Sequence, residues 1–315
     1  MTINELFNQF NEIVKMPFSY LLSPDKRVFI LYLFTSLLLA YIVYVKSGLK
    51  KSFLGYLFKK QIWIGKSAII DYGFIFFNSL IKVFFIAPML VYALYLTLFI
   101  SEYLTSQFGI SKLNWSVTTL LATYTLTIIV VNDFMSFIVH YLMHKIPFLW
   151  QFHKIHHSAT VLNPFTQYRI HPVELIINNV RGIFVKGCLT GIFIYLANGQ
   201  VSLITFLGIN IFNFIFLAFG SNLRHSHVQF KYYNFLEYIF ISPFQHQIHH
   251  SNKKEHYDKN MGSRFAIWDW IFGTLVRSEK VVQLRFGLGK SEDNNYDSFL
   301  KNLINPFINF LKYLK

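Results

Sequence analysis

The chain has 315 residues, of which 54% are hydrophobic and only 14% are charged. Soluble domains carry about 25% charged residues, so this composition excludes an ordinary water-soluble globular protein. The net charge of +14 is typical of a membrane protein whose basic residues face the cytoplasm and anionic headgroups, and we expect no nucleic-acid partner.

The N-terminal part begins with residues 1–22, which place apolar side chains at helical spacing with polar residues between them. This pattern predicts an amphipathic helix that lies in the membrane interface. Residues 28–45 then form an uncharged apolar run that is long enough to cross a bilayer. Residues 46–66 contain six lysines and no acidic residue, so the sequence predicts that this loop is cytoplasmic.

Further uncharged apolar runs follow at residues 83–100 and 113–131, and we expect the short loop between them to lie outside. Residues 187–220 hold two more runs, separated by Asn-Gly-Gln at 198–200. These two runs predict a hairpin that enters and leaves the membrane from the same side. The sequence thus predicts an all-α integral membrane helical bundle of about four to five spanning or hairpin helices.

Histidine is confined to residues 140–256, at or beyond the predicted cytoplasmic ends of the helices. One pair is spaced four residues apart, and two triplets are spaced three and four apart, so the rings within each set project from one helical face. These residues are His140, His144, His153, His156, His157, His246, His249 and His250. Imidazole is a common metal ligand, and one ion takes about four to six ligands. The pattern therefore predicts two metal ions in a cytoplasmic histidine-rich cap.

The ligand type leaves iron, zinc, copper and nickel open. The His-Glu-x-x-His signature of zinc metalloproteases and the Glu-x-x-His pair of soluble di-iron enzymes are missing. Neutral imidazoles leave the metals more positively charged than carboxylates would, which fits iron that activates dioxygen. Two other classes remain as alternatives: a metal transporter, because intramembrane histidines mark ion pathways, and a zinc-dependent lipid hydrolase.

The ordered histidine motifs, together with His-Pro at 171–172, resemble the fatty acid hydroxylase/sterol desaturase superfamily. The stretch NMGSRFAIWDWIFGT at 260–274 adds to the resemblance, which extends over residues 120–278. The segment NLRHSH followed by ISPFQHQIHHS is similar to bacterial proteins of the sterol desaturase family.

This resemblance implies a membrane di-iron, dioxygen-dependent oxidase that hydroxylates or desaturates a C–H bond of a sterol, acyl or ether lipid. By motif position it assigns metal binding to the eight clustered histidines and to His225, with His171 and His227 as further candidates. The spacing of His225 and His227 differs from the i, i+4 pair of fatty-acid 2-hydroxylases. The cofactors implied are two non-haem iron ions.

Neither a dinucleotide-binding fingerprint nor a haem-attachment signature occurs in the chain. We therefore expect electrons to come from a separate ferredoxin or cytochrome-type protein that docks on the basic cytoplasmic face. The lipid substrate should enter sideways from the bilayer. The expected location is the bacterial inner membrane, with the active site on the cytoplasmic side.

We divide the chain into N-terminal amphipathic and membrane helices (1–112), a fatty acid hydroxylase/sterol desaturase-like di-iron catalytic domain (113–280) and an amphipathic tail (281–315). No repeat or linker separates these parts, so they are expected to form one unit. The only cysteine, Cys188, lies in an apolar run and is expected to serve packing.

Several residues near the motifs are candidates for supporting roles. Asp133 precedes His140 by seven residues and shares its helical face, so we expect its carboxylate to hydrogen-bond a metal-ligating imidazole. Asn222 lies one turn before His225 and is expected to orient a ring or bind water. Trp268 and Asp269 are expected to stabilise the fold of the cap, and Gly273 to form a turn.

Overall fold

The computed structural model describes residues 3–200, 211–281 and 283–313. Within these ranges the regular secondary structure is helical, with a single antiparallel bridge between Phe240 and Phe265. The all-α fold class predicted from the sequence is therefore confirmed.

Four helical stretches of the described residues are long and apolar enough to cross a membrane. They are α2 (Ile30–Ser47), the region Lys60–Phe108, α8 (Val117–Lys145) and α10 (Pro172–Ala197). The second stretch consists of α4 (Lys60–Trp63), α5 (Lys66–Ile81), the π-helical turn η2 (Lys82–Ile86), α6 (Ala87–Met89) and α7 (Val91–Phe108). These stretches confirm a protein built on membrane helices.

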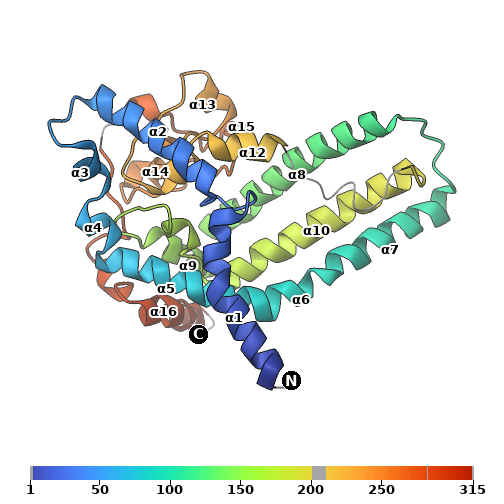
Figure 1. The fold of residues 1–315 in the computed structure, drawn as a ribbon, viewed down its shortest axis with the longest axis horizontal. Coiled ribbons are helices and arrows are strands. Elements are labelled where there is room, and N and C mark those ends of the chain that lie inside the picture. Colours follow the sequence, from blue (N-terminus) through green and yellow to red (C-terminus); the bar gives the residue numbers. More distant parts are fainter. Residues whose placement is uncertain (1–2, 201–210, 282, 314–315) are drawn as a thin grey trace.

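Helices α7, α8 and α10 run side by side and form one long limb of the molecule (Figure 1). Two glycines on α10 allow α7 to approach closely. A Cβ atom on Gly187 would lie 2.9 Å from the side chain of Leu96, and one on Gly191 would lie 2.7 Å from the carbonyl of Thr97. Small residues at this i, i+4 spacing are a common means of packing membrane helices.

Helix α10 begins at Pro172, fifteen residues before the apolar run that was expected to start at 187. The prediction was wrong because Arg181 and Lys186 interrupt the run in sequence but not in structure. Arg181 donates to the carbonyl of Asn132 on α8 at 2.9 Å. This bond satisfies the charged side chain, so Arg181 can lie within the helix without ending it. For the second arm of the predicted hairpin, residues 201–210 lie outside the described residues, and α12 (Ile211–Ala218) covers part of the remainder.

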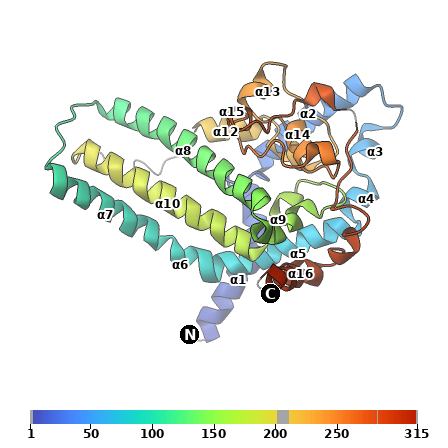
Figure 2. The same cartoon turned by 180° about the vertical axis from the view of Figure 1, so that it is seen from behind.

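The histidine-bearing elements gather at one end of the limb, as both views show (Figures 1 and 2). They are α9 (Pro147–His157), η4 (Ser221–His225) and α14 (Pro243–His249), together with the end of α8. The remaining short helices are η1 (Tyr20–Leu22), α3 (Phe53–Leu57), η3 (Thr166–Tyr168), α13 (Leu236–Ile239), η5 (Lys254–His256), α15 (Ile267–Ile271), η6 (Ser278–Lys280) and η7 (Asp293–Asn295). The predicted histidine-rich cap is thus present, while its cytoplasmic side stays a prediction.

Both terminal segments predicted to be amphipathic helices are helical: α1 (Ile3–Ser19) and α16 (Phe299–Tyr313). Helix α16 packs on the cap, where the ring of Phe307 lies 5.3 Å from that of Phe152 on α9. Their position in the membrane interface and the three-part division of the chain stay predictions.

The segment around α15 stabilises the cap as expected. The Asp269 carboxylate accepts the backbone N–H groups of Met261 and Gly262 and the hydroxyl of Thr274. Gly273 has φ +70°, which is the left-handed conformation that glycine adopts at a turn.

Candidate metal centre

The structure brings nine of the predicted histidines into two adjacent groups, and within each group one ligand atom per residue lies within 4.8 Å of all the others. We call them the five-histidine group (His140, His144, His153, His157, His249) and the four-histidine group (His156, His225, His246, His250). Each triplet divides between the two groups, so both triplets serve one centre.

Local sequence explains why these rings converge. The pair at the end of α8 is one helical turn apart. Helix α9 starts at Pro147, where the missing N–H costs no hydrogen bond. Helix α14 starts with Pro243 after a capping box, in which Ser242 and Gln245 satisfy each other's backbone N–H groups. Both triplets therefore lie on short helices with well-defined starts.

The Nε2 atoms face one another at short range. In the five-histidine group, His153 Nε2 lies 3.0 Å from that of His140 and 3.2 Å from that of His157. In the four-histidine group, His225 Nε2 lies 3.2 Å from that of His156 and 3.1 Å from those of His246 and His250. Two nitrogens bound at right angles to one ion, each at about 2.1 Å, lie about 3.0 Å apart. The spacing therefore fits shared coordination.

For three of the nine histidines, the hydrogen bond on the opposite ring nitrogen shows that Nε2 is not a donor. Nδ1 of His140, His156 and His249 lies 2.7, 3.2 and 2.8 Å from the carbonyls of Met261, Arg169 and Lys259 respectively. A carbonyl only accepts, so the proton is on Nδ1 and the Nε2 lone pair points inward. Lone pairs that face one another repel unless a cation lies between them, so the donor set fits bound metal ions.

Burial keeps the rings neutral. It lowers the pKa of His153 and of His156 to about 3, so neither carries a charge at neutral pH. Nε2 of His144 and of His249 is buried and has no hydrogen-bond partner among the described residues. A buried polar atom without a partner is costly, and a metal ion would satisfy both.

Two carboxylates next to the centre were not predicted from the sequence. Glu174 Oε1 lies 3.0 Å from Nδ1 of His153, and Asp258 Oδ1 lies 3.3 Å from Nδ1 of His144. The contact of Asp258 is a hydrogen bond, and such a partner fixes the tautomer of a ligating imidazole and increases its basicity. The signal for Glu174 was its place three residues after His171, in the first turn of α10.

A buried ion pair supports the four-histidine group from behind. The backbone carbonyl of Arg169 accepts a hydrogen bond from Nδ1 of His156, and the guanidinium of Arg169 donates one to Asp71 Oδ1 at 2.6 Å. Both side chains are at most 1% exposed. Ser67 and Ser158 accept the other N–H groups of the guanidinium. Helix α5, outside the histidine region, is thereby tied to the metal centre.

The two predicted supporting residues have partners other than imidazole. Asp133 is fully buried and accepts the backbone N–H groups of Arg264 and Phe265 and the indole N–H of Trp268. The expected bond from Asp133 to a ligating ring is therefore wrong. Asn222 donates to the carbonyl of Arg27 at 2.6 Å instead of orienting a ring. Both residues hold the cap on the membrane helices.

The remaining histidines lie outside both groups. His171 caps α10 by accepting from the N–H of Val173, and its Nε2 lies 3.2 Å from the carbonyl of Leu303. His227 donates to the carbonyl of Tyr56 at 2.8 Å. The candidate metal role of these two residues is therefore withdrawn.

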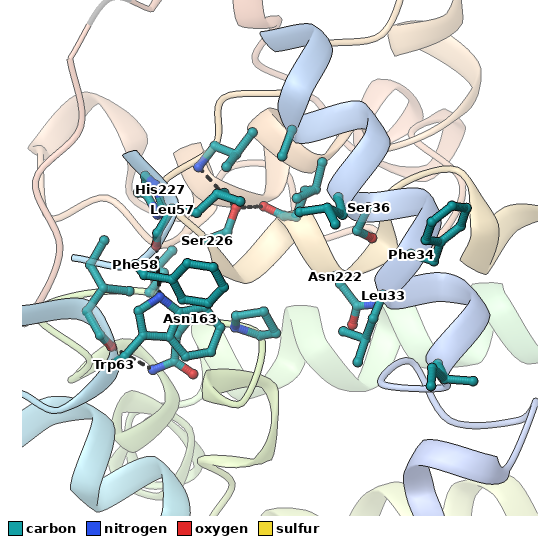
Figure 3. A pocket seen from close by; sticks show the side chains of 18 residues that line it. Leu33, Phe34, Ser36, Leu57, Phe58, Trp63, Asn163, Asn222, Ser226 and His227 are labelled. Carbon is teal, nitrogen blue, oxygen red and sulfur yellow. Dashed lines mark hydrogen bonds between the residues drawn. The ribbon is translucent and has the colours of Figure 1, made fainter. Parts of the chain in front are cut away.

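One cavity adjoins the centre, and a second pocket lies along α2. A polar cavity of about 300 Å³ has His144, His157, His249 and His250 in its wall, together with Asp258 and Glu292. An apolar pocket of about 370 Å³ lies along α2 (Figure 3). Its wall includes Asn222, Leu223, Ser226 and His227, which flank His225 in the sequence, while His225 itself is not part of the wall.

Comparisons with known proteins agree with this arrangement. Residues 125–274 match the fatty acid hydroxylase family model. An alkylglycerol monooxygenase from Caenorhabditis elegans is 29% identical over 170 residues, which cover 54% of this chain and 30% of that protein. The ornithine lipid hydroxylase OlsE from Rhizobium tropici is 27% identical over 183 residues, which cover 57% of this chain and 49% of that protein.

The human alkylglycerol monooxygenase is 26% identical over 155 residues, which cover 48% of this chain and 30% of that protein. The chain thus spans less than half the length of each of these curated relatives. No solved structure matches it significantly. The matched region contains all nine histidines of the two groups. Residues 125–274 therefore match a fatty acid hydroxylase domain, and the relatives that share this region are lipid monooxygenases and hydroxylases.

Proposed function

We propose that this protein is a metal-dependent membrane oxidoreductase that hydroxylates a C–H bond of a lipid with dioxygen. The observation that carries the proposal is the pair of buried histidine groups, whose Nε2 atoms face one another at 3.0–3.2 Å. The names of two relatives, alkylglycerol monooxygenase and ornithine lipid hydroxylase, support a lipid as the substrate.

We assign two non-haem iron ions to the centre, one to each group. When bound, they would supply the dioxygen chemistry that side chains lack. Hydroxylation consumes one O₂, two electrons and two protons, and it releases one water along with the alcohol. The nine histidines are the proposed metal ligands, and Glu174 and Asp258 are proposed to hold two of the rings in place.

The protein's own task is to orient these rings and to admit each reactant by a separate route. Glu292, whose side chain is 48% exposed, lies in the wall of the polar cavity and opens a route for water and protons. The apolar pocket along α2 adjoins a candidate membrane span and suits a lipid chain that enters from the bilayer. In this proposal, water reaches the centre through the polar cavity, and the lipid approaches it from the pocket along α2.

The orientation follows from the lysine-rich segment 46–66, which we assign to the cytoplasm. The polypeptide crosses the membrane once through 66–108 and returns through α8. The end of α8 that carries the histidines then lies on the same side as the lysines. A ferredoxin or cytochrome-type donor would dock there, because acidic electron-transfer proteins are attracted to a basic surface.

The experiment compares iron-loaded and zinc-loaded protein. The purified chain is loaded anaerobically, and metal content is measured by mass spectrometry; we expect about two ions per chain, since each group can complete one coordination sphere. With a reduced ferredoxin and a membrane lipid extract, the iron form should consume oxygen and add one oxygen atom to a lipid. The zinc form should do neither, because zinc has no redox chemistry.

Three results would contradict the proposal. Iron-loaded protein that consumes no oxygen with any lipid fraction and reductant would exclude an oxidase. Hydrolysis of a lipid ester by the zinc form would indicate a hydrolase, and metal uptake into vesicles that contain the protein would indicate a transporter. A product lacking two hydrogens instead of gaining oxygen would change the reaction to desaturation.

A further inference from the structure

A second group of charged residues, separate from the two histidine groups, lies where the membrane helices meet the cap. Arg27 precedes α2, Arg181 and Lys186 lie within α10, and Arg264 lies in the cap. We call these four residues the cation cluster. Arg264 Nη1 lies 3.4 Å from Asp133 on α8, and Arg181 donates to the carbonyl of the adjacent Asn132 at 2.9 Å, so these two cations meet the same point of α8. Arg27 and Lys186 are close enough for the charge of Arg264 to act on them.

Few anions face the cation cluster. Asp133 contacts Arg264 Nη1 at 3.4 Å, but its oxygens already accept three other N–H groups. Asp25 is paired with Lys26. The residues outside the described ranges, 1–2, 201–210, 282 and 314–315, contain no Asp or Glu. The cation cluster therefore keeps an excess of positive charge.

Two of the four cations are free to bind a ligand. Arg27 has no side-chain hydrogen bond or ion pair to any described residue. Burial and the neighbouring Arg264 lower its pKa to about 10, so it is still charged at neutral pH. Lys186 is exposed and likewise has no such partner in the described part of the chain. Uncompensated charges in a membrane span are expensive and mark functional sites.

One end of the apolar pocket along α2 lies near the backbone of Arg27. Ile30, three residues after Arg27, lies in its wall, and so does Asn222, which binds the carbonyl of Arg27. Figure 3 shows Asn222 and Leu33 towards one side of the pocket and Trp63 towards the other. A single molecule with an anionic group and an apolar chain could occupy both places.

We propose that the cation cluster binds the phosphate headgroup of an anionic membrane lipid whose acyl chain lies in the pocket along α2. Guanidinium groups bind phosphate oxygens in a bidentate manner, and the apolar lining suits the chain. Asp133 and His140 are seven residues apart on α8, about 10 Å along the helix, so a headgroup beside Arg264 lies close to the metal centre. This inference rests on the proposed function in naming that lipid as the substrate.

Bromine on an acyl chain quenches tryptophan fluorescence at short range, and Trp63 is placed to report it. The full-length protein, without added iron, is placed in phosphatidylcholine nanodiscs and titrated with dibrominated phosphatidylglycerol. We expect saturable quenching that Trp63→Phe removes. Dibrominated phosphatidylcholine should need at least tenfold more lipid for the same effect, because it lacks net negative charge.

Variants locate the headgroup. Arg27→Gln and Lys186→Gln should each weaken phosphatidylglycerol binding by about tenfold, since each removes a charge-assisted hydrogen bond to the phosphate. Arg27→Lys keeps the charge and should preserve the preference for anionic lipid. The matched control is Arg277→Gln, because Arg277 pairs with Glu279 on the cap surface; it should change nothing.

Equal binding of the two brominated lipids, or wild-type binding by both glutamine variants, would overturn the proposal. Inorganic phosphate should not displace the brominated lipid, because it has no chain; complete displacement at millimolar concentration would make this a site for a free anion. Binding is measured without iron or reductant, so a protein that selects anionic lipid but never oxidises one would refute only the proposed function.

Discussion

The substitution Asp71→Asn tests whether the buried ion pair behind His156 stabilises the metal centre, because Asp71 is not itself a proposed metal ligand. The two oxygens of Asp71 serve different donors: Oδ1 accepts from Arg169 Nε, and Oδ2 accepts from Asn163 and Thr166. Asparagine keeps only one oxygen, so one set of donors would meet an N–H group. The substitution also removes the negative charge that compensates the buried guanidinium.

The size of the effect follows from burial. The side chains of Asp71 and Arg169 are 0% and 1% exposed, so water cannot replace the lost partner. Breaking such a buried pair costs about 3–5 kcal/mol. The carbonyl of Arg169 orients His156, and losing support of this kind typically weakens metal binding by about 10–100-fold. The five-histidine group has no such contact with Arg169, so its ion should stay.

The assay combines thermal unfolding in detergent with metal content after dialysis against a weak chelator. We expect a lower unfolding temperature and about one ion per chain instead of two. Asp297→Asn is the control, because Asp297 forms an exposed pair with Lys301; it should keep both ions and the wild-type unfolding temperature. Wild-type stability and full metal content in Asp71→Asn would refute the link from α5 to His156.

Three further predictions concern the ligands, the neighbouring carboxylate and the topology. His157→Ala and His250→Ala should each abolish oxygen consumption while leaving membrane insertion intact. The double variant should lose hardly more activity than either single variant, because the effects of residues in one site are not additive. Activity losses that multiply would indicate two separate sites. Glu174→Gln should weaken metal binding by about 10–100-fold, measured by competition with a chelator, because it removes a carboxyl oxygen beside Nδ1 of His153; wild-type metal affinity would contradict this. In a Cys188-free background, cysteines near residues 55, 160 and 255 should be labelled only from the cytoplasmic side and one near 107 only from outside; labelling at 107 and 160 from the same side would overturn the topology.

The sequence predicted the histidine centre well because its signal is local. Histidines three and four residues apart lie on one helical face, so the sequence already predicts how the members of each triplet are arranged. Only the packing of the helices against one another had to come from the structure. Asp269 and Gly273 were likewise predictable from a short stretch. The apolar runs indicated membrane helices for a similar reason, since each is a continuous feature of the chain.

Contacts between distant segments could not be predicted in this way. Asp71 and Arg169 are 98 residues apart and reach each other only because α5 packs beside the cap. Asp133 shares a helical face with His140, but the backbone of residues 264–265 takes up its oxygens. The start of α10 was misplaced because charge interrupts an apolar pattern without interrupting a helix.

The placement of the carboxylates explains how the centre can be both well ordered and strongly electrophilic. Glu174 and Asp258 contact the outer nitrogens of His153 and His144, so an imidazole separates each charge from the metal position. A directly bound carboxylate oxygen would lie about 2 Å from the ion, whereas a carboxylate behind the ring lies roughly 7 Å away, and its Coulomb attraction falls to roughly a third. With metal ions bound, the two carboxyl groups would hold the rings in place while neutralising little of the metal charge, which would suit an oxidant for an unactivated C–H bond.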